Sequence, residues 1–196
     1  VFCDTGAFTE DQSRRILEAG IAKGLIPRIH ANQLQRTNSV QLAIELGAAS
    51  ADHLSNSTDA DIEALAASQT VATLLPGAEF STQHQVKLGR KFLDAGATVA
   101  IATDCNPGSS YTTSMPFCIA AAVSLMGFNV EEALLAATLG GAKALRRTDI
   151  GRISTGFQAD MALLNTDSYI HLAYRPGVNL ISHTYKSGRA VTTWQK

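Results

Sequence analysis

The stretch VAIATDCNPGSS, Val99–Ser110, decides how the fold of this chain is interpreted. Small and β-branched residues predict a strand that runs into Asp104. The Asn, Pro and Gly that follow are typical of a turn. A turn does not explain why an acid closes an apolar strand, so the ends of the other predicted strands have to be considered with it.

Short apolar strands alternate with amphipathic helices over the first 150 residues. Thr9 with Gln12 forms a capping-box pattern, and Thr58 is a second helix N-cap candidate. The predicted strands cover 1–3, 25–30, 48–53, 70–76 and 98–104, and the predicted helices cover 9–24, 39–47, 58–68, 84–96, 115–126 and 130–145. This repeat of strand and helix predicts a parallel sheet.

The ends of three predicted strands favour a barrel over a doubly wound sheet. A doubly wound sheet usually carries a glycine-rich phosphate turn, and neither GxGxxG nor GxxxxGK[ST] occurs here. His30, His53 and Asp104 close three strands, and a (β/α)8 barrel places its chemistry at such ends. Only four to five strand–helix units fit before residue 150, so we expect residues 1–150 to be the second half of a barrel, roughly from the end of strand 4 to strand 8 and the helices that follow.

The pattern changes near Gly151, where glycine-punctuated strands replace the strand–helix repeat. Lys186-Ser187-Gly188 predicts a hairpin turn between two of these strands. We therefore expect a boundary near residue 150 and part of a small β-sandwich domain over residues 151–196.

Composition restricts the function classes. The chain has 196 residues, a formal net charge of −1 and 17% charged residues, which gives no electrostatic case for binding nucleic acid or a membrane surface. No apolar run is long enough for a membrane span. The three cysteines are an odd number without a CxxC pair, so we expect no disulfide framework and a cytoplasmic location.

Recurrence is what makes His30, His53 and Asp104 candidates for chemistry. A single His or Asp at a strand end is more often a structural residue or a cap, but the ends of parallel strands meet at one mouth of a barrel. Imidazole and carboxylate together suit zinc or a related divalent metal, which lowers the pKa of bound water. No His-x-His pair completes the ligand set in this chain. We expect the other histidines to be solvent-facing or structural: His84, His171 and His183.

Six segments resemble the amidohydrolase superfamily and, within it, the imidazolonepropionase family. In chain order they are RIHANQ (28–33), SADHL (50–54), VATLLPGAEFS (71–81), ATDCNPGSSYTTSMPF (102–117), AATLGGAKAL (136–145) and GRISTGFQADMALLN (151–165). The last segment is generic to the superfamily, whereas TDCNPGSSYT after LLPG is much more specific. The similarity extends from Val1 to about Val191.

The resemblance implies hydrolysis of the cyclic amide 4-imidazolone-5-propanoate to N-formimidoyl-L-glutamate in histidine degradation, with one divalent metal ion, zinc or iron. It implies that His30 and Asp104 bind the metal. It also implies that Asp104 moves a proton and that His53 polarises the substrate carbonyl or holds the water. The residues it matches to substrate contacts are Gln33, Asn106, Gly108 and Ser109. Many members of the family have Glu where this chain has Gln33, and Gln cannot act as a base.

The family pattern is incomplete in this chain, because its first-strand HxH and the substrate-binding residues of its first half are missing. We therefore expect that the chain alone binds metal weakly and has no activity. We also expect either that the native protein is about twice as long or that this chain is a fragment. Another cyclic-amide hydrolase or a deaminase, and a non-catalytic half-barrel, remain alternatives. No lysine stands at the relevant strand ends for a carbamylated binuclear site. Open sheet edges favour pairing with another chain, of which a homodimer is one form.

Overall fold

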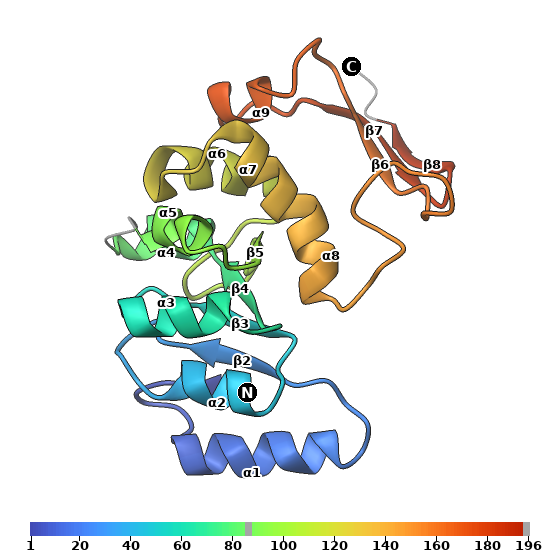
Figure 1. Cartoon of the computed structure of the whole chain (residues 1–196). Coiled ribbons are helices and arrows are strands. Elements are labelled where there is room, and N and C mark those ends of the chain that lie inside the picture. Colours follow the sequence, from blue (N-terminus) through green and yellow to red (C-terminus); the bar gives the residue numbers. More distant parts are fainter. Residues whose placement is uncertain (85–87, 194–196) are drawn as a thin grey trace.

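The computed structural model describes residues 1–84 and 88–193 (Figure 1). The strands are β1 Phe2–Cys3, β2 Arg28–Ala31, β3 Ser50–His53, β4 Val71–Leu74, β5 Val99–Ile101, β6 Met161–Leu164, β7 Ile181–Lys186 and β8 Arg189–Thr193. The helices are α1 Glu10–Ile21, α2 Ser39–Glu45, α3 Asp59–Ala66, α4 Pro76–Thr82, α5 Leu88–Asp94, α6 Met115–Met126, α7 Val130–Leu135, α8 Gly141–Ala144 and α9 His171–Tyr174. A π-helical turn, η1 Ala136–Gly140, joins α7 to α8.

The first five strands form one parallel sheet in the order β1-β2-β3-β4-β5, so each strand pairs with its neighbour in the chain. The register places His30 beside Asp52 and Ala31 beside His53. Consecutive parallel strands joined by helices are the arrangement expected for part of a (β/α)8 barrel, as the sequence predicts.

The two faces of this sheet pack against different elements. Alternate strand residues such as Ile29 and Ala51 belong to the main core, which also holds Phe92 of α5. On the other face, Val71 and Ala100 pack against Ala144 of α8. Figure 1 accordingly shows α3, α4 and α5 on one side of the sheet and α8 on the other.

The π-helical turn brings Gly140 against the backbone of β5. A Cβ on Gly140 would lie 2.1 Å from the carbonyl oxygen of Val99 and 3.0 Å from the Cα of Ala100. Only glycine allows this close approach. The predicted helix over 130–145 is therefore confirmed as a helical stretch, with an unpredicted π turn in its middle.

Helix α4 was not predicted, because the strand was expected to continue through Pro76. Pro76 occupies the first turn of α4, where its fixed φ and its missing N–H are tolerated. The strand expected to reach Asp104 ends at Ile101. Of the helix predicted over 84–96, α5 covers Leu88–Asp94, and residues 85–87 lie outside the described part of the chain. His84 is half-buried beside the amide of Asn56, at 3.3 Å, rather than solvent-facing.

The last three strands form a separate antiparallel sheet in the order β6-β7-β8. The predicted hairpin turn is confirmed, because Ser187 and Gly188 both have positive φ, as a tight turn between antiparallel strands requires. This part is tied to the helices by Tyr169, whose hydroxyl donates to Glu131 Oε1 at 2.6 Å. The change of sheet type falls between α8 and β6, and a domain boundary near residue 150 stays a prediction.

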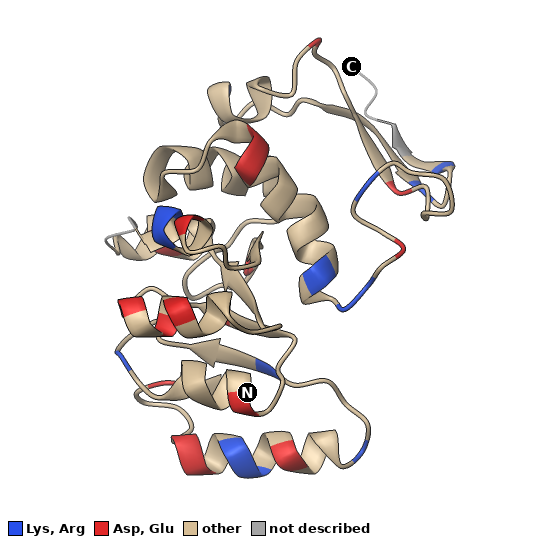
Figure 2. Ribbon diagram, in the orientation of Figure 1, with Lys and Arg blue, Asp and Glu red and all other residues tan. Residues whose placement is uncertain are grey.

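Charged residues of both signs are spread along the chain. Figure 2 shows Lys and Arg as well as Asp and Glu on both the parallel-sheet part and the antiparallel part of the ribbon. Across residues 1–84 and 88–193, no helix combines the length and hydropathy needed to cross a membrane.

Candidate functional site

His30, His53 and Asp104 come together at the carboxyl edge of the parallel sheet. His53 Nε2 lies 3.8 Å from Asp104 Oδ2, and the ring centroids of His30 and His53 are 4.2 Å apart. All three side chains line one cavity of about 460 Å³, here called the mouth. Their convergence follows from parallel pairing, because the ends of neighbouring parallel strands share one edge.

Strained backbone conformations occur at the same edge. Asn32, His53, Leu54 and Asp104 all have positive φ, between 48° and 78°. Residues other than glycine rarely adopt this left-handed backbone region, and backbone strain of this kind concentrates at functional sites. The left-handed turn at Asp104 brings its carboxylate towards His53, although the strand ends three residues earlier.

Burial keeps both imidazoles neutral. Burial and, to a lesser extent, the neighbouring His30 lower the pKa of His53 to about 3, against the opposing charge of Asp4. Burial also lowers the pKa of His30, against the opposing charge of Asp4. Neutral imidazole is the form that binds a metal.

The donor types at the mouth fit a divalent metal, but the ligand set is partial. His30 Nε2 is buried and makes no hydrogen bond among the described residues, although Asp4 Oδ2 lies 3.5 Å from it. Within the described ranges, no three His, Cys, Asp or Glu side chains lie close enough together to hold a metal ion. His30, Asp104 and His53 therefore supply suitable donors without forming a closed site of three or more ligands.

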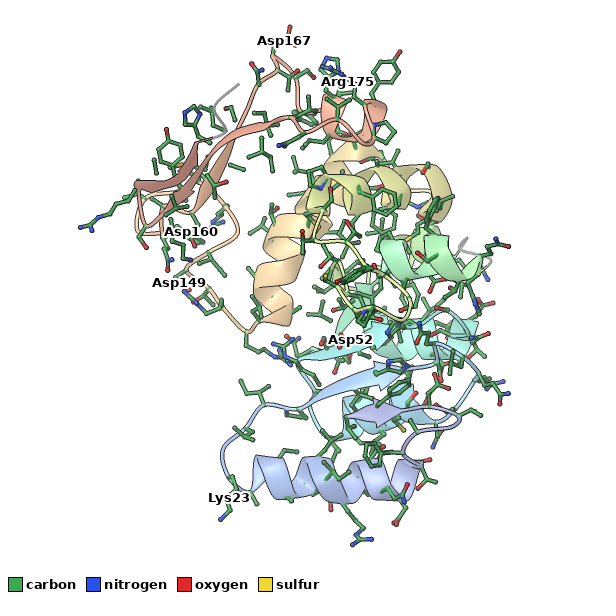
Figure 3. The ribbon with its side chains drawn as sticks, turned by 180° about the vertical axis from the view of Figure 1, so that it is seen from behind. Lys23, Asp52, Asp149, Asp160, Asp167 and Arg175 are labelled. Atoms are coloured by element: carbon green, nitrogen blue, oxygen red, sulfur yellow. The ribbon has the colours of Figure 1, made fainter. Side chains whose placement is uncertain are left out.

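Two carboxyl groups in the mouth have a raised affinity for protons. Burial raises the pKa of Asp104, and the charge of Asp52 adds to this. Burial likewise raises the pKa of Asp52, against the stabilising effects of Ser50, Arg28 and Thr73. Asp52 lines the mouth, on the side of the sheet that α8 approaches (Figure 3). Carboxyl groups with raised pKa values in a cavity are suited to proton transfer.

Asp4 organises the segment that follows β2, and the sequence analysis missed it. Its buried carboxylate accepts four backbone N–H groups: those of Thr5, Gln33, Leu34 and Gln35. Asp4 Oδ2 also lies 3.5 Å from His30 Nε2. The signal was present, because VFCD and SADH deliver Asp4 and Asp52 at or near strand ends in the same way that Asp104 follows its strand.

The predicted substrate-binding residues lie outside the lining of the mouth as the described residues define it: Gln33, Asn106, Gly108 and Ser109. The amide of Asn106 donates to the Asp104 backbone oxygen at 2.7 Å and accepts from the Gly108 and Ser109 N–H groups at 2.8 and 2.9 Å. These bonds shape the turn after Asp104. The substrate-binding roles of all four residues stay predictions.

Glu79 is a second residue that the sequence analysis missed. It is 4% exposed on α4, and its Oε1 accepts a hydrogen bond from the Ser55 hydroxyl. Burial raises the pKa of Glu79, and Ser55 and His84 oppose that effect. With α4 unpredicted, the sequence pattern contained no signal that would place Glu79 near the mouth.

The chain matches one protein family over nearly its whole length. The profile of the amidohydrolase family matches residues 7–191. A relative named imidazolonepropionase from Streptomyces griseus is 63% identical over 191 residues, which cover 97% of this chain and 49% of the relative. A protein of the same name from Mycolicibacterium smegmatis is 60% identical and covers 100% of this chain and 49% of its own length. The chain thus spans about half the length of the curated relatives it matches.

Solved structures share the fold. An adenosine deaminase from Xanthomonas campestris with bound zinc superposes with a TM-score of 0.79 at 20% identity, over 94% of this chain and 49% of that one. An atrazine chlorohydrolase from Arthrobacter aurescens complexed with zinc gives a TM-score of 0.79 at 16% identity, over 97% of this chain and 49% of that one. These similarities support a partial (β/α)8 barrel followed by part of a small β domain.

Proposed function

Since the chain belongs to the amidohydrolase family, we propose that it forms part of a metal-dependent hydrolase acting on 4-imidazolone-5-propanoate. The product is N-formimidoyl-L-glutamate. The observation that carries the proposal is the convergence of His30, His53 and Asp104 at one mouth. Relatives named imidazolonepropionase, 58–63% identical to this chain, support the choice of substrate. The activity is proposed for the whole protein, because the chain spans about half of those relatives.

His30 and Asp104 are the residues that we propose to hold a divalent metal, zinc or iron. The metal would polarise the substrate carbonyl and lower the pKa of water. The neutral imidazole of His30 and the carboxylate of Asp104 are the donor types that both metals accept. Further ligands are needed beyond those that the described residues supply.

We propose that side chains of the mouth move the protons of the reaction. In the reaction, the oxygen of water bonds to the ring carbonyl carbon, the carbon–nitrogen bond breaks, and the ring nitrogen leaves with a proton. Asp104 can take a proton from water and deliver it to that nitrogen. Its raised pKa favours the protonated form of Asp104 that exists between these two transfers. His53, 3.8 Å from Asp104, can hold the attacking water through Nε2. Gln33, Asn106, Gly108 and Ser109 are proposed to contact the substrate.

We propose a cytoplasmic location for the protein. The three cysteines are unpaired, as is usual in a compartment that keeps thiols reduced. An association of two copies remains a prediction, and size-exclusion chromatography tests it.

Metal analysis and an activity assay test the proposal. In a protein carrying this chain within the full length of its relatives, we expect about one metal ion per chain and hydrolysis of imidazolone propionate. His30→Ala should lose the metal and the activity, whereas the control His183→Ala, in the β part, should keep both. Hydrolysis of another cyclic amide with none of this substrate would refute the assignment. One equivalent of zinc or iron bound tightly by the 196-residue chain alone would contradict the partial ligand set.

A further inference from the structure

Asn56 joins the loop that follows β3 to the loop that follows β2. Its backbone N–H donates to the carbonyl oxygen of Asn32 at 2.9 Å, and its side-chain Nδ2 donates to the carbonyl oxygen of Gln33 at 2.7 Å. The two partners lie 24 and 23 residues earlier in the chain. One residue therefore connects two strand–helix units at the carboxyl edge of the sheet.

Both loops that Asn56 connects begin with strained backbone. Asn32 has a φ of 51°, and His53 and Leu54 have φ values of 78° and 67°. Such conformations persist only where the surrounding structure fixes them. The Leu54 N–H donates to the Ala31 carbonyl oxygen at 2.9 Å, and Asn56 adds a side-chain bond to this backbone contact. Since only the side-chain bond can be removed by substitution, it is the point at which the arrangement can be tested.

The main chain of Gln33 is held by side chains on both sides. Its N–H donates to Asp4 Oδ2 at 2.8 Å, and its carbonyl oxygen accepts from Asn56 Nδ2 at 2.7 Å. Within residues 1–84 and 88–193, the side-chain amide of Gln33 forms no hydrogen bond, and the residue is half-buried. A fixed main chain with an unbonded amide leaves the amide available to a ligand.

The segment Ser55–Asn56 is itself anchored by the next strand–helix unit. The Ser55 hydroxyl donates to Oε1 of Glu79, a residue of α4 that is 4% exposed. Asn56 Nδ2 also lies 3.3 Å from Nε2 of His84, just after α4. An amide NH₂ group only donates, so its two hydrogens serve the Gln33 carbonyl oxygen and the His84 ring nitrogen. These contacts fix the orientation of the Asn56 side chain.

We propose that Asn56 is a positioning residue of the hydrolase, which holds Gln33 in place beside His53 for substrate binding. Gln33 carries no proton to transfer, so its amide contributes to binding and not to the chemical step. Asn56 acts through Gln33 and therefore governs the affinity for substrate. This role rests on the proposed function, whereas the connection between the two loops does not.

Kinetics of the variant Asn56→Asp test the role in substrate binding, in a protein carrying this chain within the full length of its relatives. The new carboxylate would face the carbonyl oxygens of Asn32 and Gln33, which only accept hydrogen bonds, so Gln33 would be displaced. We expect KM for imidazolone propionate to rise about tenfold, with kcat within about threefold and the metal content unchanged. The control is Asn179→Asp, which keeps the exposed Oδ1 that accepts the Ile181 N–H at 3.1 Å and should leave KM unchanged.

A double-mutant cycle separates positioning from a general loss of structure. Gln33→Ala should raise KM by itself, and Asn56→Asp should add little in that background, because residues that act through one another are not additive. Additive increases in KM, an unchanged KM in Gln33→Ala, or a fall in kcat at constant KM would each overturn the proposal. If Asn56→Asp does not fold, Asn56→Ala removes the donor without adding a charge and is put through the same cycle.

Hydrogen exchange measured by mass spectrometry tests the connection without substrate. The segment 31–35 should exchange faster in Asn56→Asp than in the wild-type protein, and Asn179→Asp should leave it unchanged. Unchanged exchange in Asn56→Asp would overturn the connection, whether or not the wild-type protein hydrolyses imidazolone propionate. Faster exchange in a protein whose wild type does not hydrolyse this substrate would support the connection and refute the proposed function.

Discussion

Replacing Asp4 by Asn should destabilise the chain by roughly 3 kcal/mol. Asp4 Oδ2 accepts the N–H groups of Gln33 and Leu34 at 2.8 and 2.9 Å, and Oδ1 accepts those of Thr5 and Gln35 at 2.7 and 3.3 Å. In either orientation, the amide of Asn places an NH₂ group against two of these donors. Each hydrogen bond to a charged group contributes about 1.5 kcal/mol or more, so two lost bonds give about 3 kcal/mol.

Urea unfolding at neutral pH, followed by circular dichroism, measures this change as a difference in the free energy of unfolding at constant m-value. The control is Asp167→Asn, whose side chain is 96% exposed and which should change stability by less than about 0.5 kcal/mol. Amide exchange of residues 33–35 should also accelerate in the Asp4 variant. A stability within about 0.5 kcal/mol of wild type would show that the four bonds are replaceable and refute the reasoning.

Two further predictions concern the junction of η1 with α8 and the hairpin. Gly140→Ala should destabilise the chain by more than about 1 kcal/mol in thermal unfolding, because the new Cβ would lie 2.1 Å from the Val99 carbonyl oxygen. Gly141→Ala, whose Cβ meets no described atom within 4 Å, should instead stabilise the chain by up to about 1 kcal/mol. Equal effects of the two substitutions on the thermal stability would contradict this packing. The Lys186 ammonium, together with the backbone N–H of Ser187, lowers the pKa of Asp160 to about 2, so its contribution to stability should be present above about pH 4 and lost as the pH falls towards 2. Lys186→Gln should raise that pKa in an NMR titration of the carboxyl carbon, and an unchanged value would exclude the ion pair as its main cause.

The grouping of His30, His53 and Asp104 could be predicted from the sequence because it depends on one rule. Parallel strands carry their last residues to one edge, and alternating strands and helices identify a parallel sheet. The same rule would have identified Asp4 and Asp52, whose strands end in the same way.

Contacts between distant segments could not be predicted from local pattern. The bonds from Asp4 span about thirty residues, and that between Ser55 and Glu79 spans 24. The apolar run TVATLLP continues a strand pattern without interruption, so only packing shows that the strand stops at Leu74 and that α4 begins at Pro76. The left-handed turn at Asp104 is a tertiary feature of the same kind.

The π-helical turn η1 has a consequence for how this region tolerates changes in length. A π turn accommodates one residue more than a regular helix, so deleting one residue from Ala136–Gly140 would restore ordinary α-helix. Since the extra residue is taken up within one turn, the helix after such a deletion would keep roughly its present phase, whereas a deletion from the regular helix α7 would rotate it by about 100° and move it by about 1.5 Å. Only the deletion in α7 would take Ala144 out of its contact with Val71 and Ala100. In evolutionary terms, η1 is a place where the chain can lose one residue without shifting the helix on the inner face of the sheet, so a one-residue deletion is expected there rather than within α7.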